Sequence, residues 1–150
     1  MSYMLLWRVA PIFTRVLLIY AIFNFGVVGM IYIINPFPIT SQIGIELNSA
    51  VAVTNARVGL GGFHVGVAVM AAYCAFSKHR VWAGLQIALC MTIVPVLARV
   101  YGVFVDGPEE QTLMLLRVEG AALLIFLIGV MVHWRYGPNV ERGGPSRANS

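Results

Sequence analysis

Charged residues are scarce in this sequence. Only 11% of the 150 residues are Asp, Glu, Lys or Arg, whereas 59% are hydrophobic, and the mean hydropathy is +0.83. A soluble domain of this size carries about 25% charged residues. The deficit therefore excludes an ordinary water-soluble domain and indicates burial in lipid.

The sequence also lacks the short motifs that mark common catalytic sites. It has no Gly-rich phosphate loop, no HExxH, no GxSxG and no pair of carboxylates at catalytic spacing. Its two cysteines, Cys74 and Cys90, form no CxxC and no Cys/His cluster. No basic surface interleaved with aromatic residues points to nucleic acid. We therefore expect a protein that is not an enzyme, holds no metal or other cofactor and binds no nucleic acid.

Long apolar runs, by contrast, are abundant. A helix needs about 20 apolar residues to cross about 30 Å of hydrocarbon. Four runs meet this requirement: residues 16–35, 58–77, 81–98 with an extension to 105, and 113–134. They lack the alternation of barrel strands, and in lipid every backbone polar group must be satisfied internally. The runs predict an all-α integral membrane protein with a bundle of four transmembrane helices.

The segments at the two ends of the chain differ from these runs. Residues 1–15, MSYMLLWRVAPIFTR, combine aliphatic groups, a tryptophan and arginines, which is typical of an interfacial segment. Residues 16–134 form the predicted membrane domain. Residues 135–150 are rich in Gly, Pro, Ser and Asn, and we expect a mobile cytoplasmic tail there.

The basic residues indicate the orientation. Arginines precede the first run, the sequence KHR at 78–80 joins the second and third, and three arginines follow the fourth. The opposite connections, around 35–49 and 106–110, contain no lysine or arginine. By the positive-inside rule both termini are expected in the cytoplasm.

Three arginines lie at the ends of the runs away from these basic segments. Arg57, Arg99 and Arg117 are each 18 to 21 residues from the inner basic residues, which is about 27–31 Å of helix. All three are therefore expected near the outer boundary, at one level. Arginines this far from the cytoplasmic side are unusual.

Glu119 has no partner on its own helix. It follows Arg117 by two residues, or about 200° of rotation, and so lies on nearly the opposite face. We expect it to pair with an arginine of another helix, Arg57 or Arg99. The sequence thus predicts an outer polar cluster of the following residues: Arg57, Arg99, Arg117, Glu119, Asn55 and Asp106, with Tyr101 nearby.

Three interpretations of this cluster stay open. The arginines could reach individually for lipid phosphates, since long basic side chains snorkel to the interface. They could form a structural network with the acidic loops. Alternatively, their excess positive charge could bind an anionic ligand through bidentate hydrogen bonds.

The second run contains further candidates. His64 lies seven residues after Arg57, on the same face of an α-helix, and could extend the cluster inward. The alternative is a packed histidine bonded to a carbonyl. Gly59, Gly62 and Gly66 form a stripe of small residues, which favours close helix packing within the chain or against another subunit.

Three motifs together carry a resemblance. They are ARVGLGG at 56–62, RVYGVFVDG at 99–107, and the acidic residue of the fourth run. They resemble a family of small four-helix bacterial inner-membrane proteins that is known only as a domain of unknown function. The family's features fall on these positions: Arg57, Gly61, Gly62, Arg99, Gly102, Asp106, Gly107 and Glu119. The resemblance implies the fold over about residues 15–134 but no activity.

Two functions are expected from these observations. The first is an accessory or structural subunit that packs against a larger complex of the bacterial inner membrane, with lipids and other integral membrane subunits as its partners. The alternative is a binder or carrier of an amphiphilic anionic ligand, such as a lipid or a quinone-like molecule, at the outer arginines.

Overall fold

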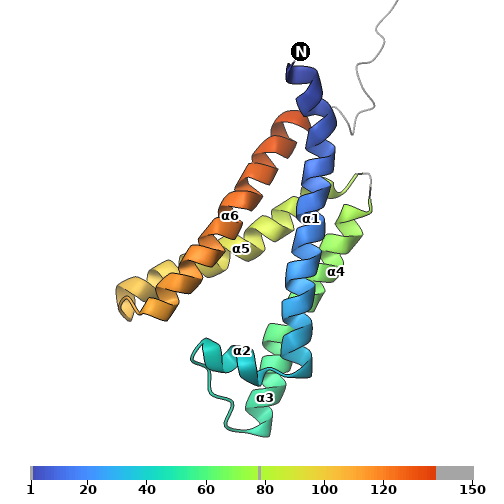
Figure 1. Cartoon of the computed structure of the whole chain (residues 1–150). Helices are drawn as coiled ribbons and strands as arrows, with labels where there is room; N and C mark the ends of the chain where they lie inside the picture. The colour runs from blue at the N-terminus through green and yellow to red at the C-terminus, as the bar shows by residue number, and fades with distance from the viewer. Residues whose placement is uncertain (1, 78, 138–150) are drawn as a thin grey trace, which may run out of the picture.

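The computed structural model describes residues 2–77 and 79–137, and within them every regular element is a helix (Figure 1). Along the chain these elements are α1 (Ser2–Ile34), α2 (Phe37–Gln42), α3 (Ala50–Ala56), the π-helix η1 (Arg57–Gly62), α4 (Phe63–Ala75), α5 (Val81–Val105) and α6 (Glu110–Tyr136). The predicted all-α class is confirmed.

Four helical stretches in the described residues are long and apolar enough to cross a membrane: Val9–Ile34, Ala50–Ala75, Val81–Val105 and Glu110–Tyr136. The prediction of a four-helix, multi-pass membrane protein is confirmed. The second stretch begins at Ala50, eight residues before the predicted run. Its start is fixed by Ser49, whose hydroxyl oxygen accepts a hydrogen bond of 3.1 Å from the Ala52 N–H.

The segment predicted as interfacial is part of the first helix. α1 begins at Ser2 and continues through Pro11 into the first span without a break. Most of the predicted tail, residues 138–150, lies outside the described residues, so the prediction of its mobility stays a prediction.

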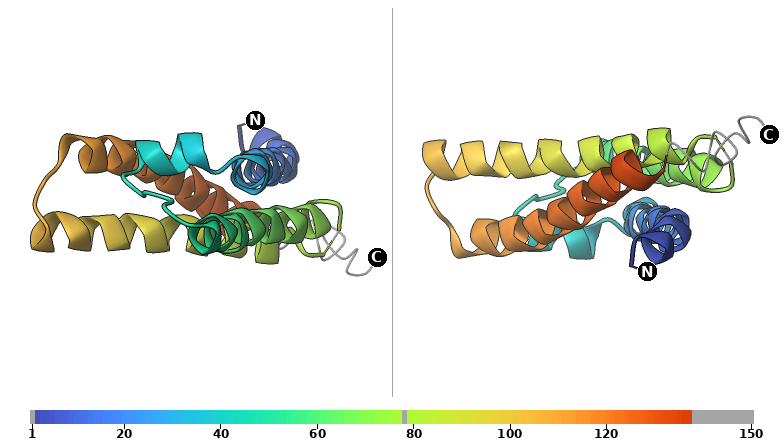
Figure 2. Two further views of the ribbon diagram at one scale, coloured as in Figure 1. Left: turned by 90° about the horizontal axis from the view of Figure 1, so that it is seen from below. Right: turned by 90° about the horizontal axis from the view of Figure 1, so that it is seen from above.

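The spans alternate in direction and associate as two pairs. α1 packs mainly on α4 and α5 mainly on α6, and the pairs splay apart (Figures 1 and 2). The start of α1, the α4–α5 connection and the end of α6 lie toward one end, which we call the core end. The α1–α2 and α5–α6 connections lie toward the other end, which we call the open end.

The hydrophobic core lies at the core end. Its buried residues come from all four spans: Leu17, Leu18, Ala21, Ala71, Cys74, Ala75, Val81, Leu85, Ala88 and Phe126. Two glycines allow this close packing. A Cβ on Gly84 would lie 2.6 Å from the Cys74 Cβ, and one on Gly129 would collide with Leu17.

The predicted glycine stripe does not pack within the chain. Gly59, Gly62 and Gly66 are exposed, and a Cβ added to any of them would meet no other helix within 4 Å. The contact between α1 and the second span is made instead by Gly29 and Gly61, where an added Cβ would lie 2.8 Å from Val65 and 2.7 Å from Ile33, respectively. Packing of the stripe against another subunit stays a prediction.

Candidate functional site: a polar cavity between the spans

An ion pair links α5 to α6 toward the open end. The Arg99 Nε donates to the Glu119 Oε2 over 2.6 Å, and the two side chains are 29% and 26% exposed. The sequence predicted that Glu119 would pair with Arg57 or Arg99, and the partner is Arg99. Because each charge is half-buried in an apolar span, their pairing compensates much of the cost of placing either one there.

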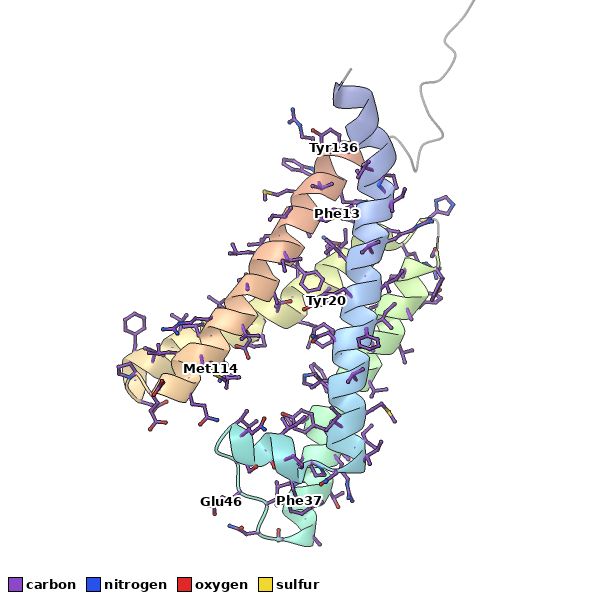
Figure 3. All side chains as sticks on the ribbon, in the orientation of Figure 1. Phe13, Tyr20, Phe37, Glu46, Met114 and Tyr136 are labelled. Atoms are coloured by element: carbon purple, nitrogen blue, oxygen red, sulfur yellow. The ribbon has the colours of Figure 1, made fainter. Side chains whose placement is uncertain are left out.

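Glu119 also lines a cavity of about 470 Å³ between the spans. Residues of α1, α4, α5 and α6 form its wall, and most of them are apolar. Five side chains bring polar atoms to the wall: Tyr20, Asn24, His64, Thr92 and Glu119. Tyr20 lies on the side of α1 that faces α6 (Figure 3), and its ring centroid is 6.3 Å from that of Phe126.

The orientation of His64 is fixed by its own helix and by two aromatic rings. Its Nδ1 lies 2.6 Å from the Leu60 carbonyl oxygen. Since a carbonyl oxygen can only accept, Nδ1 carries the hydrogen, and Nε2 of the neutral ring is an acceptor. The rings of Phe25 and Tyr32 have centroids 5.8 and 5.9 Å from the imidazole. His64 is thus packed and bonded to a carbonyl of its own helix, and it also lines the cavity.

The π-helix η1 separates Arg57 from His64. A π-turn closes i to i+5 hydrogen bonds, so it contains one residue more than an α-turn. The extra residue rotates the following face by about 100°. Arg57 is exposed whereas Gly61 is buried and His64 half-buried. The prediction that Arg57 and His64 share a face assumed a regular α-helix, and the π-helix removes that assumption.

The motif RVYGVFVDG surrounds a second hollow at the α5–α6 hairpin. This hollow, of about 610 Å³, is lined by Arg99, Gly102, Asp106 and Gly107, among others. Gly107 has φ +100°, which favours glycine, and it reverses the chain after α5. Arg99 lines this hollow whereas Glu119 lines the cavity, so the ion pair stands between the two.

The remaining arginines do not join this pair. Arg117 lines a groove between α2 and the start of α6, together with Gln42 and Glu110. Arg57 and Asn55 are exposed on η1 and α3, which lie away from the α5–α6 hairpin (Figures 1 and 2). Tyr101 is 69% exposed. The structure thus places the predicted cluster in separate regions, because the two helix pairs diverge toward the open end.

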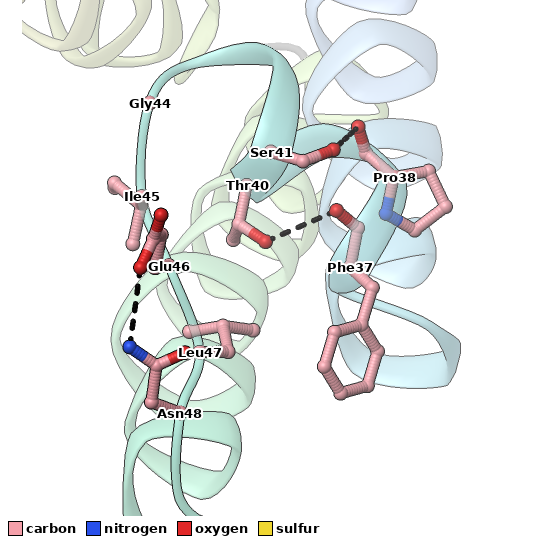
Figure 4. Close-up of a pocket in the computed structure, with 9 residues that line it drawn as sticks. All are labelled: Phe37, Pro38, Thr40, Ser41, Gly44, Ile45, Glu46, Leu47 and Asn48. Carbon is pink, nitrogen blue, oxygen red and sulfur yellow. Dashed lines mark hydrogen bonds between the residues drawn. The ribbon is translucent and has the colours of Figure 1, made fainter.

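A further pocket lies in the connection between α1 and α3. It has about 620 Å³ and is formed by α2 and the loop that follows it (Figure 4). Its polar side chains bond to near neighbours: the Ser41 hydroxyl donates to the Pro38 carbonyl oxygen, and Asn48 donates to Glu46 over 3.2 Å. These local bonds shape the loop. The residues that line this pocket come from one connection, whereas those that line the cavity come from four spans.

A family model described as "Domain of unknown function (DUF4345)" matches residues 13–130. The chain belongs to this family. The resemblance predicted from the motifs is confirmed, and the matched DUF4345 region contains the whole wall of the cavity. No curated protein and no solved structure matches the chain.

Sequence reasoning missed the uncharged polar groups of the cavity. Tyr20, Asn24 and Thr92 line it, yet the polar cluster predicted from the sequence contains none of them. Asn24 left a signal, because an amide in the apolar run IFNFG needs a polar surrounding or a hydrogen-bond partner. The apolar residues of the wall could not be recognised in the sequence, since apolar residues that face a cavity are of the same types as those that face lipid.

Proposed function

We propose that this membrane protein binds an amphipathic, lipid-soluble molecule in the cavity between its spans. The cavity itself is the observation that carries the proposal. Its volume of about 470 Å³ lies within the range of about 300–1,000 Å³ typical of ligand sites. Such sites combine a mostly apolar wall with a few converging polar groups, and the cavity has this composition.

Exposure along the cavity wall supports a ligand that comes from lipid. Tyr20 and Val118 line the cavity and are 45% and 63% exposed. Side chains of α1 and α6 in the cavity wall are therefore also in contact with the surroundings of the helices. In a membrane these surroundings are hydrocarbon or its boundary, so the ligand is one that dissolves there.

The distribution of charge favours an uncharged head group over an anion. Arg99 is already paired with Glu119, and Arg57 and Arg117 lie outside the cavity wall. The arrangement of several arginines around one site, on which the anionic alternative depended, lacks support. We propose binding without chemical conversion, in the bacterial inner membrane with both termini cytoplasmic.

Native mass spectrometry after gentle solubilisation of the full chain tests this function. We expect a small-molecule adduct of fixed stoichiometry on the wild-type protein. Ala122 lines the cavity, so Ala122→Phe places a ring in the space of the ligand and should remove the adduct. Ala83 on α5 is exposed, and Ala83→Phe serves as the matched control that keeps the adduct. A bare wild-type chain, or an adduct that survives in Ala122→Phe, would contradict ligand binding in the cavity.

One observation favours a second function, that of an accessory subunit. The stripe of Gly59, Gly62 and Gly66 is exposed and meets no helix of this chain, whereas small residues in spans commonly allow another helix to approach. If a partner subunit packs there, Gly62→Leu should release it during gentle purification. A stable complex in that variant would exclude the stripe as the contact.

A further inference from the structure

We infer that the molecule held in the cavity presents a hydroxyl group, and that His64 and Glu119 are the acceptors available to its hydrogen. This inference rests on the proposed function and narrows the class of ligand. Most polar groups of the cavity wall can only accept a hydrogen bond, and few can donate one.

The first acceptor is Nε2 of His64. The hydrogen on Nδ1 is committed to the Leu60 carbonyl oxygen at 2.6 Å, so the neutral ring presents a lone pair at Nε2. Within residues 9–77 and 79–137 no hydrogen bond to Nε2 is seen, although the residue lines the cavity. The flanking rings of Phe25 and Tyr32 restrict rotation of the imidazole and hold this acceptor in place.

The second acceptor is the Glu119 carboxylate. A carboxylate offers about four lone-pair positions and no donor, and Arg99 occupies one position, at Oε2. The side chain bridges from the ion pair to the cavity wall. The remaining lone pairs of the carboxylate therefore accept from a group in the cavity.

The Thr92 hydroxyl and the Met91 backbone carbonyl are two further acceptors in the cavity wall. The Thr92 hydroxyl donates its hydrogen to the Ala88 carbonyl oxygen, so only its acceptor capacity remains. Pro95 has no N–H to donate to the Met91 carbonyl, and both residues line the cavity. Among the polar groups of the wall, only the Tyr20 hydroxyl and the Asn24 amide keep a hydrogen to donate.

These acceptors discriminate between ligands. An ester, ether or quinone carbonyl brings no donor of its own for the His64 and Glu119 lone pairs, which then depend on the two donors of the wall. In a site from which the ligand has displaced water, unpaired polar groups are costly. A phosphate or carboxylate would also face the Glu119 charge. A hydroxyl donates its hydrogen to one of these acceptors. A hydroquinone, with two hydroxyls, and a lipid alcohol, with one, share this chemistry.

The test uses matched pairs of probes with the full chain in lipid nanodiscs, measured by calorimetry. One pair is decylhydroquinone and its dimethyl ether, and the other is 1-decanol and decyl methyl ether. We expect the hydroxyl form to bind at least about tenfold more tightly, because hydrogen bonds to charged groups are the stronger ones. A preference confined to the aromatic pair assigns a hydroquinone, and one confined to the aliphatic pair assigns a lipid alcohol.

Two variants test which residues cause the preference for the hydroxyl form. His64→Phe keeps a ring between Phe25 and Tyr32 but removes the acceptor, and Glu119→Gln keeps the side chain's size. Each should reduce the preference for the hydroxyl form, and the variant that lacks the accepting group should reduce it to about twofold or less. A full preference in both variants contradicts the inference. Arg117→Gln changes a charge outside the cavity wall and should retain the full preference. Circular dichroism and gel filtration identify a variant that fails to fold, and the other variant then decides.

The outcomes separate the ligand class from the function. Equal binding of both members of each pair, lost in Ala122→Phe, overturns the hydroxyl inference and leaves ligand binding in the cavity intact. A co-purifying molecule without a hydroxyl does the same. Failure of all four probes to bind, combined with a bare chain in native mass spectrometry, overturns both.

Discussion

The core end and the open end of the molecule are formed by the same spans but are packed differently, and the cavity wall includes Ala21 and Phe126 of the core cluster. At the core end Gly84 and Gly129 allow helices to touch, and a buried cluster that includes Leu18 and Leu85 fills the space between them. At the open end the helix pairs diverge, the Arg99–Glu119 pair joins only α5 to α6, and a cavity remains between the spans.

This difference indicates how the protein separates stability from binding. Close packing gains dispersion energy, which is the main source of helix association in lipid, and it leaves no room for a ligand. Polar groups among loosely packed helices contribute less to stability but give a ligand both space and hydrogen-bonding partners. We therefore expect substitutions at the core end to change folding most, and substitutions at the open end to change binding.

The largest expected effect is at Gly84. In Gly84→Ala the new Cβ would lie 2.6 Å from the Cys74 Cβ and 3.0 Å from Leu18, so α4 and α5 must move apart. We expect a loss of about 3 kcal/mol in the free energy of unfolding, at the upper end of overpacking effects. Reversible unfolding in mixed detergent micelles, followed by circular dichroism, measures it.

Gly66→Ala is the matched control for this substitution. Gly66 is also in a span, but its Cβ would meet nothing within 4 Å. Since alanine favours a helix over glycine by about 0.5–1 kcal/mol, this variant should be as stable as the wild type or slightly more so. Equal destabilisation by both substitutions would show that the core end isn't the more closely packed one.

The second expected effect concerns the ion pair at the open end. In a double-mutant cycle, Arg99→Ala and Glu119→Ala should show a coupling energy of about 2 kcal/mol. Either single substitution already removes the charged hydrogen bond, so the second one does not remove it again. Arg117→Ala with Glu119→Ala is the control cycle and should show almost none, since Arg117 lines a different groove. The measurement is the same unfolding equilibrium.

A coupling energy near zero for Arg99 and Glu119 would mean that the pair adds nothing to stability. It would also remove the reason for treating one Glu119 oxygen as occupied. A large coupling in the control cycle would instead show that the two hollows communicate through α6, contrary to the separation seen in the structure.

Features that depend on local sequence could be predicted well. A span needs only a sufficiently long apolar run, so all four were found. The partner of Glu119 was narrowed to two arginines by the rotation of about 100° per residue, which places Arg117 on the wrong face. The structure then decides for Arg99.

Features that depend on helix register and on packing between helices could not be predicted from the sequence. Nothing in the letters RVGLGG fixes a π-turn, yet η1 determines which glycine meets α1 and turns Arg57 away from His64. The cavity also escaped prediction, since it results from the divergence of two helix pairs that are held together at Gly84 and Gly129. The contacts that set this divergence join residues far apart in the sequence.

The smallest expected effect lies at the hairpin of the open end, where two motif glycines differ in their requirement for glycine. Gly107 has φ +100°, so Gly107→Ala should cost about 1 kcal/mol, the strain of an L-residue in this region. Gly102 is helical, and its Cβ would lie 3.6 Å from the Asp106 Oδ2, an ordinary contact. Gly102→Ala should therefore be neutral or slightly stabilising in the same unfolding measurement.

The same two variants show whether the hairpin serves the cavity. Gly107→Ala strains the turn that follows Arg99, and Arg99 is the ion-pair partner of the Glu119 carboxylate. If the turn sets the position of Arg99, adduct occupancy in native mass spectrometry should fall in Gly107→Ala more than stability does. If occupancy follows stability in both variants, the hairpin only closes the fold, and the ion pair's position is set within the spans by α5 and α6 themselves.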